Sequence, residues 1–229
     1  MDDPKQINEQ AYDHLADWYL DWANSQESPR QRYTDKVLQN ARPHPHILEL
    51  GCGPGIPITK MLLDRGASVI GNDISRTQIR MATSRCPEAA FIAGDMATLE
   101  FAPETFDGIT CFYAIFHLPR EEQKAMLAKI FSWLKPGCML VFNTATIDSA
   151  EIHGEMMGHG MFWSSYDVEG NTAMVTAAGF EGVEAEVIEA GEGKLEESDP
   201  DYGVSFLWIS ALKMKKKKKK RKGTDDSGD

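Results

Sequence analysis

Short apolar runs alternate with longer amphipathic segments along most of the chain. The apolar runs have the length and the bounding turn residues of buried strands, and they cover 47–50, 68–71, 90–93, 106–112 and 139–144. Apolar residues at helical spacing predict helices over 28–40, 57–65, 75–85, 119–134 and 166–178. Strands that alternate with helices predict an α/β fold with a mostly parallel sheet.

The two ends of this pattern differ from its middle. Residues 1–10 are polar, and we expect them to be frayed. An aromatic stripe over 12–22 predicts one helix. The segment between the fifth strand and the last helix is rich in Gly, Met and His, and we expect an adaptable apolar loop that forms a lid. Residues 183–189 and 203–212 predict a final antiparallel pair of strands.

Composition adds a domain boundary to this picture. The 229 residues suit a single domain with one sizeable core, which we expect to span 1–212. The Lys-rich residues 213–229 are expected to form a disordered tail. The four cysteines form no Cys-x-x-Cys pair, which favours free thiols. There is neither a signal-like N-terminus nor an apolar run long enough to cross a bilayer, so we expect a cytoplasmic protein.

Charge is distributed unevenly between the domain and the tail. Residues 1–212 hold 15 basic and 32 acidic residues, a formal net charge of −17, whereas the tail holds nine basic residues. An acidic body repels phosphate, so it disfavours nucleic acids and favours a neutral or cationic small substrate. The tail itself is expected to bind a nuclear import receptor or an anionic surface, which would allow a nuclear location, unless it is incidental to the fold.

A glycine-rich turn, ILELGCGPGIP, follows the first predicted strand. Glycines permit positive φ and remove Cβ atoms, so a ligand can come close to the backbone. A P-loop requires a Lys-Ser or Lys-Thr pair after its last glycine, but Ile56 and Pro57 follow Gly55. A dinucleotide fingerprint requires its third glycine one residue later than Gly55. Neither phosphate-binding motif therefore fits.

The spacing acid-x-Gly-x-Gly-x-Gly over residues 49–55 resembles motif I of class I S-adenosylmethionine-dependent methyltransferases of the small-molecule type. Asp73 follows the second strand, 22 residues after Gly51, and the segment AGDMATLEF follows the third. FDGITCFYAIFHL and LKPGCML match the family's fourth strand and the turn before its fifth, with Cys138 in place of a second glycine. The resemblance covers roughly residues 10–212. It implies a Rossmann-like seven-stranded sheet, mostly parallel, with helices on both faces and an antiparallel last strand.

The resemblance also implies S-adenosyl-L-methionine as cofactor and S-adenosyl-L-homocysteine as product. Asp73 is then expected to accept both ribose hydroxyls, and Asp95 is expected to bond the adenine amino group while Met96 packs on the ring. Glu49 would orient the glycine turn or reach the methionine ammonium through water. The complete expected set of cofactor-binding residues is Tyr12, Glu49, Gly51, Cys52, Gly53, Gly55, Asp73, Ile74, Asp95, Met96 and Phe112.

His117 is the candidate catalytic residue. It lies just past the fourth strand, at the sheet edge where open α/β sheets bind ligands. There it is expected to take a proton from the acceptor, to position the acceptor, or only to anchor the following helix. Residues 1–45 are expected to form a helical cap over the site. The expected substrate residues are Trp18, Tyr19, Tyr113, Phe116, His153, His159 and Trp163.

Several other functions stay open on sequence grounds. Cys111, Phe112 and Tyr113 stand where a metal-dependent enzyme of the family carries carboxylates, so we expect no metal. A protein or RNA acceptor is one alternative, although the Asn/Asp-Pro-Pro-aromatic motif of base-amino methylases is missing after the fourth strand. A catalytically silent cofactor-binding regulatory protein on the same fold is another. A nicotinamide oxidoreductase is disfavoured by the glycine spacing.

Overall fold

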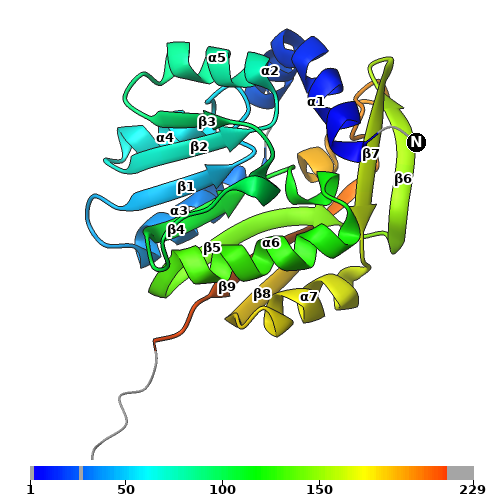
Figure 1. Cartoon of the computed structure of the whole chain (residues 1–229). Helices are drawn as coiled ribbons and strands as arrows, with labels where there is room; N and C mark the ends of the chain where they lie inside the picture. Colours follow the sequence, from blue (N-terminus) through cyan, green and yellow to red (C-terminus); the bar gives the residue numbers. More distant parts are fainter. Residues whose placement is uncertain (1–2, 26–27, 216–229) are drawn as a thin grey trace, which may run out of the picture.

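The computed structural model describes residues 3–25 and 28–215 (Figure 1). The helices are α1 Pro4–His14, α2 Ala16–Ser25, α3 Arg30–Asn40, α4 Ile58–Asp64, α5 Arg76–Arg85, α6 Arg120–Trp133 and α7 Val168–Ala177. The strands are β1 His46–Leu50, β2 Ser68–Asp73, β3 Ala90–Ala93, β4 Phe106–Cys111, β5 Leu134–Ala145, β6 Ser149–Met156, β7 His159–Ser165, β8 Glu181–Glu189 and β9 Ser205–Leu212. None of the helices in these ranges is long and apolar enough to span a bilayer.

Seven strands form the main sheet in the order β3-β2-β1-β4-β5-β9-β8. The strands β1 to β5 are parallel, and β9 runs antiparallel to both of its neighbours, β5 and β8. This confirms the expected mostly parallel sheet with an antiparallel last strand. The strand order reverses between β1 and β4, and the carboxyl ends of strands at such a switch point are where open α/β sheets bind ligands.

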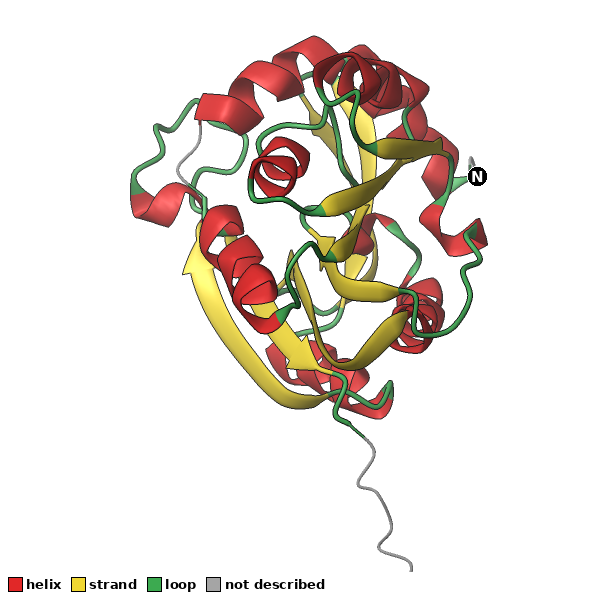
Figure 2. Cartoon of the chain, turned by 90° about the vertical axis from the view of Figure 1, so that its left-hand side faces the viewer, coloured by secondary structure: helices red, strands yellow, loops and turns green. Residues whose placement is uncertain are grey.

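Both faces of the sheet are covered, because neighbouring residues of each buried strand face opposite sides. Ile47 and Val141 pack in one buried cluster with residues of α3 and α4. Leu48 and Phe142 pack in another with residues of α6 and α7. Figure 2 shows helices on both sides of the sheet. The helix α3, which we expected to belong to a cap over the site, therefore covers the sheet instead: its Val37 lies against Gly108 of β4.

Residues 4–10, expected to be frayed, are helical, and residues 1–2 fall outside the described part of the chain. In Figure 1, α1 lies beside β7 at the carboxyl edge of the sheet. Asn8, 2% exposed, donates to the Phe162 carbonyl at 3.0 Å and accepts from the Phe162 amide at 2.9 Å. This side-chain amide thus pairs with the edge of β7 as another strand would. The helix expected over 12–22 is interrupted at Leu15, which caps α1 before α2 begins.

The segment expected to be a loop between β5 and α7 is a β-hairpin of β6 and β7. Its two connecting residues, Met157 and Gly158, have φ of 51° and 79°. Positive φ at both central residues is the geometry of the two-residue turn that matches strand twist. The usual Asn-Gly or Asp-Gly signal is absent because Met157 occupies the first position, so the sequence pattern did not reveal the turn.

The folded domain extends beyond residue 212. The Lys213 backbone bonds Gly137 and Cys138, and its ammonium donates to the Phe131 carbonyl at 2.8 Å at the end of α6. The expected boundary after residue 212 therefore lies too early. The rest of the Lys-rich tail, 216–229, falls outside the described residues, and its binding role and nuclear address stay predictions. The four cysteines are buried and unpaired.

Candidate functional site

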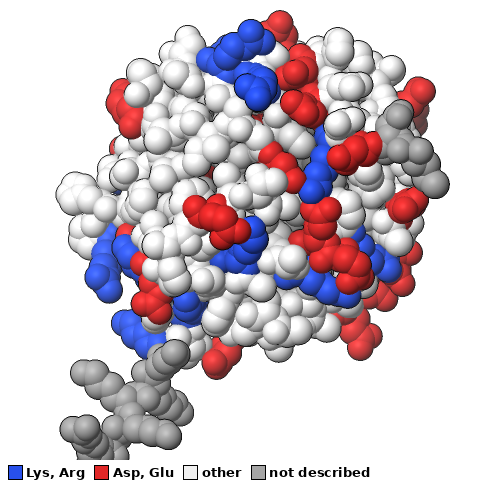
Figure 3. Space-filling model, viewed as in Figure 1, with Lys and Arg blue, Asp and Glu red and all other residues white. Residues whose placement is uncertain are grey.

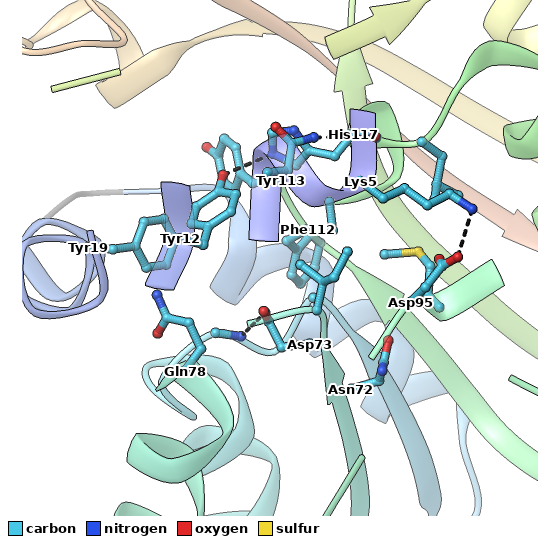
Figure 4. A pocket seen from close by; sticks show the side chains of 17 residues that line it. Lys5, Tyr12, Tyr19, Asn72, Asp73, Gln78, Asp95, Phe112, Tyr113 and His117 are labelled. Atoms are coloured by element: carbon cyan, nitrogen blue, oxygen red, sulfur yellow. Dashed lines mark hydrogen bonds and ion pairs between the residues drawn. The ribbon is translucent and has the colours of Figure 1, made fainter. Parts of the chain in front are cut away.

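A cavity opens at the carboxyl ends of β1, β2 and β4, and we call it the edge cavity (Figure 4). Eight residues expected to bind the cofactor line it: Tyr12, Gly51, Gly53, Asp73, Ile74, Asp95, Met96 and Phe112. Lys5, Asn8, Asn72 and Gln78 line it as well, although the sequence pattern did not indicate them. The roof of the cavity comes from α1 and α2, and its floor comes from the turns that follow the strands.

Asp73 ties the glycine turn to the start of α5. One of its carboxylate oxygens accepts the Gly53 amide at 2.9 Å, and the other accepts the Ser75 amide at 2.9 Å. Gly51, Gly53 and Gly55 all have positive φ, which explains why the turn requires glycine. Burial raises the pKa of Asp73 to about 6, and backbone hydrogen bonds from Ser75, Gly53 and Ile74 oppose this shift. A hydroxyl-bearing ligand that donates to this carboxylate would stabilise its charged form.

Two amide side chains in the edge cavity are buried without complete pairing. Gln78 is 1% exposed, and neither its amide nitrogen nor its amide oxygen has a hydrogen-bond partner among the described residues. Asn72 donates to the carbonyls of Ile92 and Gly94 at 2.9 Å, but its own oxygen is unpartnered within the same part of the chain. Buried polar groups without partners cost free energy. Both side chains are therefore suited to bond a ligand in the cavity.

Asp95 is already engaged by two groups of the protein. One oxygen accepts the Ala97 amide at 2.8 Å, and the other accepts the Lys5 ammonium at 2.7 Å. Lys5 also pairs with Glu122 at 2.5 Å, so α1 is tied to the start of α6. The dashed line in Figure 4 shows the Lys5 contact. An adenine amino group at Asp95 would have to share this oxygen with Lys5 or displace it.

His117 has both ring nitrogens engaged. Its Nδ1 lies 3.0 Å from the Phe162 carbonyl, which can only accept, so Nδ1 carries the proton. Its Nε2 is then the acceptor for the Tyr12 hydroxyl at 2.9 Å (Figure 4). Burial lowers the pKa of His117 from its usual 6.5 to about 4, and the bond to Phe162 opposes this shift. The ring is therefore neutral at pH 7, and it links α1, β7 and the turn after β4.

The protonation of His117 should appear in the stability of the protein. The folded-state pKa is about 4 and the usual value is 6.5, so the unfolded chain binds more protons between these values. The free energy of unfolding is therefore expected to fall as pH drops through this interval. The slope should correspond to the uptake of up to about one proton on unfolding. Denaturant titrations at several pH values should show a smaller decline in His117→Gln.

The matched control for this measurement is His153→Gln, because the His153 side chain is exposed on the hairpin. It should keep the native pH dependence. If the stability curves of the native protein and of His117→Gln run parallel from pH 7 to about pH 4, His117 is not held neutral by the fold.

A second cavity, which we call the aromatic cavity, adjoins the first. Four of the expected substrate residues line it: Tyr19, Tyr113, Phe116 and Trp163. Tyr12, Tyr19 and Tyr113 line both cavities and so separate them. Tyr113 has a φ of 54°, a strained value for a bulky residue, and its amide donates to the Asn143 side chain at 2.6 Å. Such strain is typical of functional sites.

The remaining expected cofactor residues lie around the edge cavity without lining it. Glu49 is 4% exposed, its carboxylate accepts the Thr59 hydroxyl at 2.6 Å, and burial raises its pKa to about 8. Cys52 is buried beneath the turn, close to Gly71. Gly55 allows the turn to approach Ala82 of α5 closely. These positions support the shape of the turn.

Three expected substrate residues lie away from the aromatic cavity. Trp18 stacks on Trp22, with ring centroids 5.7 Å apart. His153 and His159 line a separate groove between α1 and the hairpin, where His159 stacks on His14 at 5.1 Å. The hairpin geometry, which the sequence pattern did not reveal, turns both histidines to this outer groove. No group of three metal-ligating side chains occurs among the described residues.

Comparison with known proteins finds a methyltransferase domain in the middle of the chain. Residues 47–137 match the family model of a methyltransferase domain. Trans-aconitate 2-methyltransferase of Delftia acidovorans is 33% identical over an alignment of 134 residues that covers 55% of this chain and 48% of that protein. The chain spans about half the length of the curated relatives it matches.

Solved structures share the whole fold. An N1-methyltransferase of Burkholderia thailandensis, solved with bound 1,6-didemethyltoxoflavin and S-adenosylhomocysteine, has a TM-score of 0.68 at 16% identity and covers 94% of this chain and 92% of its own. A phosphoethanolamine N-methyltransferase of Haemonchus contortus, solved with phosphomonomethylethanolamine and S-adenosylhomocysteine, has a TM-score of 0.70 at 15% identity, over 94% of this chain and 61% of its own. Together, the matched domain model and the shared fold support a class I S-adenosylmethionine-dependent methyltransferase.

Proposed function

We propose that the chain transfers the methyl group of S-adenosylmethionine to a small-molecule nucleophile without a metal ion. The junction of the two cavities carries this proposal. The edge cavity holds the glycine turn and Asp73, the aromatic cavity beside it is almost wholly apolar, and Tyr12, Tyr19 and Tyr113 lie between them. Methyl transfer requires two adjoining sites, because the nucleophile, the methyl carbon and the sulfur must lie in line.

The edge cavity offers the groups that this cofactor requires. In the proposal Asp73 accepts the ribose hydroxyls, since each carboxylate oxygen can accept more than one hydrogen bond. Gln78 supplies the donor and the acceptor that it has free. Asp95 bonds the adenine amino group beside Lys5, and Met96 packs on the ring. The tyrosine rings at the junction can stabilise the positive charge of the sulfonium.

His117 acts in this proposal through Tyr12. Its Nε2 already accepts the Tyr12 hydroxyl, and Tyr12 lines both cavities. A base must have a free lone pair within reach of the proton that it removes. Holding Tyr12 at the junction is therefore the role that the geometry favours, and direct proton abstraction would first require this bond to break.

A small acceptor is supported by the relatives and by the surface. Trans-aconitate and 1,6-didemethyltoxoflavin, named for two relatives, are small molecules. On the face shown in Figure 3, Lys and Arg side chains are interspersed with Asp and Glu and form no separate basic patch. A basic stripe is the usual electrostatic feature of nucleic-acid binding. We also propose a cytoplasmic location, where both cofactor and small metabolites are available.

Two measurements test the function. Calorimetry should show that S-adenosylmethionine and S-adenosylhomocysteine bind the full chain, whereas NAD does not. A metabolite extract incubated with the protein and methyl-labelled cofactor should then yield a labelled small molecule, which mass spectrometry can identify. Binding of NAD in place of the cofactor would refute the assignment. Cofactor binding with no labelled product across a broad panel of acceptors would favour a silent regulatory protein, and label in RNA or protein would favour a macromolecular acceptor.

A further inference from the structure

One charged side chain stands in the otherwise apolar lining of the aromatic cavity. The walls are rings in mutual contact: Tyr19 packs on Trp22 at 5.6 Å, Trp22 on Tyr113 at 6.4 Å, and Tyr113 on Phe206 at 5.0 Å, measured between centroids. Among the described residues that line this cavity, Asp201 alone bears a formal charge. It lies in the turn before β9, and its backbone amide donates to Asp199 at 2.9 Å.

The Asp201 carboxylate has no hydrogen-bond donor within the described part of the chain, unlike its neighbour Asp199. Asp199 accepts the indole nitrogen of Trp22 at 3.1 Å. Burial, then the charge of Asp199, raises the pKa of Asp201 to about 6, and Arg30 opposes this shift. A partly buried carboxylate in an apolar cavity is costly unless a ligand pairs with it.

The charge of Asp201 affects the tyrosines that separate the aromatic cavity from the edge cavity. After burial, its charge is among the causes that raise the pKa of Tyr12, Tyr19 and Tyr113. These are the three rings that separate the cavities. A cation held between these rings and Asp201 would be stabilised by both, because aromatic faces and carboxylates each attract positive charge.

Arg30 is the nearby positive charge that could favour an anion instead. Its guanidinium lies 5.6 Å from the centre of the Tyr113 ring. However, Arg30 donates to the Ala23 carbonyl at 2.8 Å and to the Ser28 hydroxyl at 3.1 Å, and it does not line the cavity. An anionic acceptor would therefore meet Asp201 before it met Arg30.

We propose that the methyl acceptor is an amine on an apolar body of aromatic size, with its nitrogen held between the junction tyrosines and Asp201. This rests on the proposed function of the same site. An ammonium first gives a proton to the carboxylate of Asp201, which leaves a neutral amine with a lone pair. That pair forms the new N–C bond while the C–S bond breaks and its electrons stay on sulfur. The products are a methylated ammonium and neutral S-adenosylhomocysteine.

Three indole probes of one shape and different charge test this. Tryptamine is a cation, tryptophol is neutral, and indole-3-propionate is an anion. Calorimetry on the full chain, saturated with S-adenosylhomocysteine, should give tryptamine a dissociation constant at least about tenfold below that of tryptophol, with the propionate weakest. In Asp201→Asn this preference should shrink to within about threefold, and S-adenosylhomocysteine affinity should be unchanged.

The control is Glu197→Gln, which removes one charge from an exposed position on the same connection and should keep the tryptamine preference. Failure of tryptamine to bind, equal binding of the alcohol, a preference for the acid, or a preference that survives Asp201→Asn would each overturn the proposal. If the native chain does not bind S-adenosylhomocysteine at all, the proposed function itself is refuted. A tryptamine preference in a chain that transfers no methyl group would establish an amine-binding site at Asp201 but overturn the proposal that the bound amine is a methyl acceptor.

Discussion

Replacing Gly51 by alanine is expected to lower the free energy of unfolding by about 2–5 kcal/mol. Gly51 has a φ of 70°, where an L-residue is strained by about 1–2 kcal/mol. A Cβ at this position would also overlap the Cβ of Ala114, and overpacking of a closed site adds about 1–3 kcal/mol. Denaturant titration measures the total. Because Gly51 lines the edge cavity, S-adenosylhomocysteine affinity should fall as well.

Two further variants separate the effect of backbone strain from that of the overlap with Ala114. Gly66 has a φ of 81°, but a Cβ there would meet only His44, at an ordinary 3.6 Å. Gly66→Ala should therefore cost only the backbone strain, about 1–2 kcal/mol. Adding Ala114→Gly to Gly51→Ala removes the overlapping atom and should recover part of the lost stability and affinity. Equal losses in Gly51→Ala and Gly66→Ala would show that Ala114 does not crowd the turn.

Asp73→Asn should weaken S-adenosylhomocysteine binding at least about tenfold. In the proposed site the carboxylate accepts both ribose hydroxyls, and hydrogen bonds to a charged group contribute about 1.5–3 kcal/mol each. An asparagine also places an NH₂ group against one of the two backbone amides, Gly53 or Ser75, that the carboxylate now accepts. The glycine turn is then loosened in addition to the lost contacts. Calorimetry gives the affinity, and denaturant titration gives the stability.

Asp13→Asn is the matched control for this variant. Asp13 accepts the Ser75 hydroxyl at 2.5 Å and the Thr77 amide at 3.0 Å, so it holds the start of the same helix without lining the edge cavity. The Asp13→Asn variant should lose stability but keep most of its affinity for S-adenosylhomocysteine. If Asp73→Asn bound S-adenosylhomocysteine as tightly as the native chain, Asp73 would be a structural residue of the turn and not a ribose ligand.

Local features of the sequence were enough to predict the central fold. The strands β1 to β4 are short apolar runs bounded by turn residues, and their alternation with amphipathic helices predicts a parallel sheet because crossovers require it. Ser75 was recognisable as a helix cap, and its hydroxyl does accept the Gln78 amide. The glycine turn was readable for the same reason: each of its glycines has a positive φ that other residues rarely adopt.

Contacts between residues far apart in the sequence could not be predicted and are seen only in the fold. Nothing in the polar residues 1–10 indicates that Asn8 pairs with Phe162, 154 positions away, or that Lys5 meets Asp95. The same holds for the Tyr12 hydroxyl that occupies Nε2 of His117. Local periodicity reports only which face of an element is apolar. It does not report which polar side chain on another element completes a hydrogen bond.

The aromatic cavity also combines residues that the sequence pattern indicated with one that it did not. Tyr12, Tyr19 and Trp22 could be singled out as an aromatic stripe. Asp201 lies in a connection with no recognisable pattern and reaches the cavity only because β9 inserts beside β5. The resemblance to methyltransferases, the parallel sheet and the glycine turn were predictable because they depend on short-range spacing along the chain. Which residues close the site, and which charge it holds, could be seen only in the folded chain, because burial and pairing depend on contacts between distant residues.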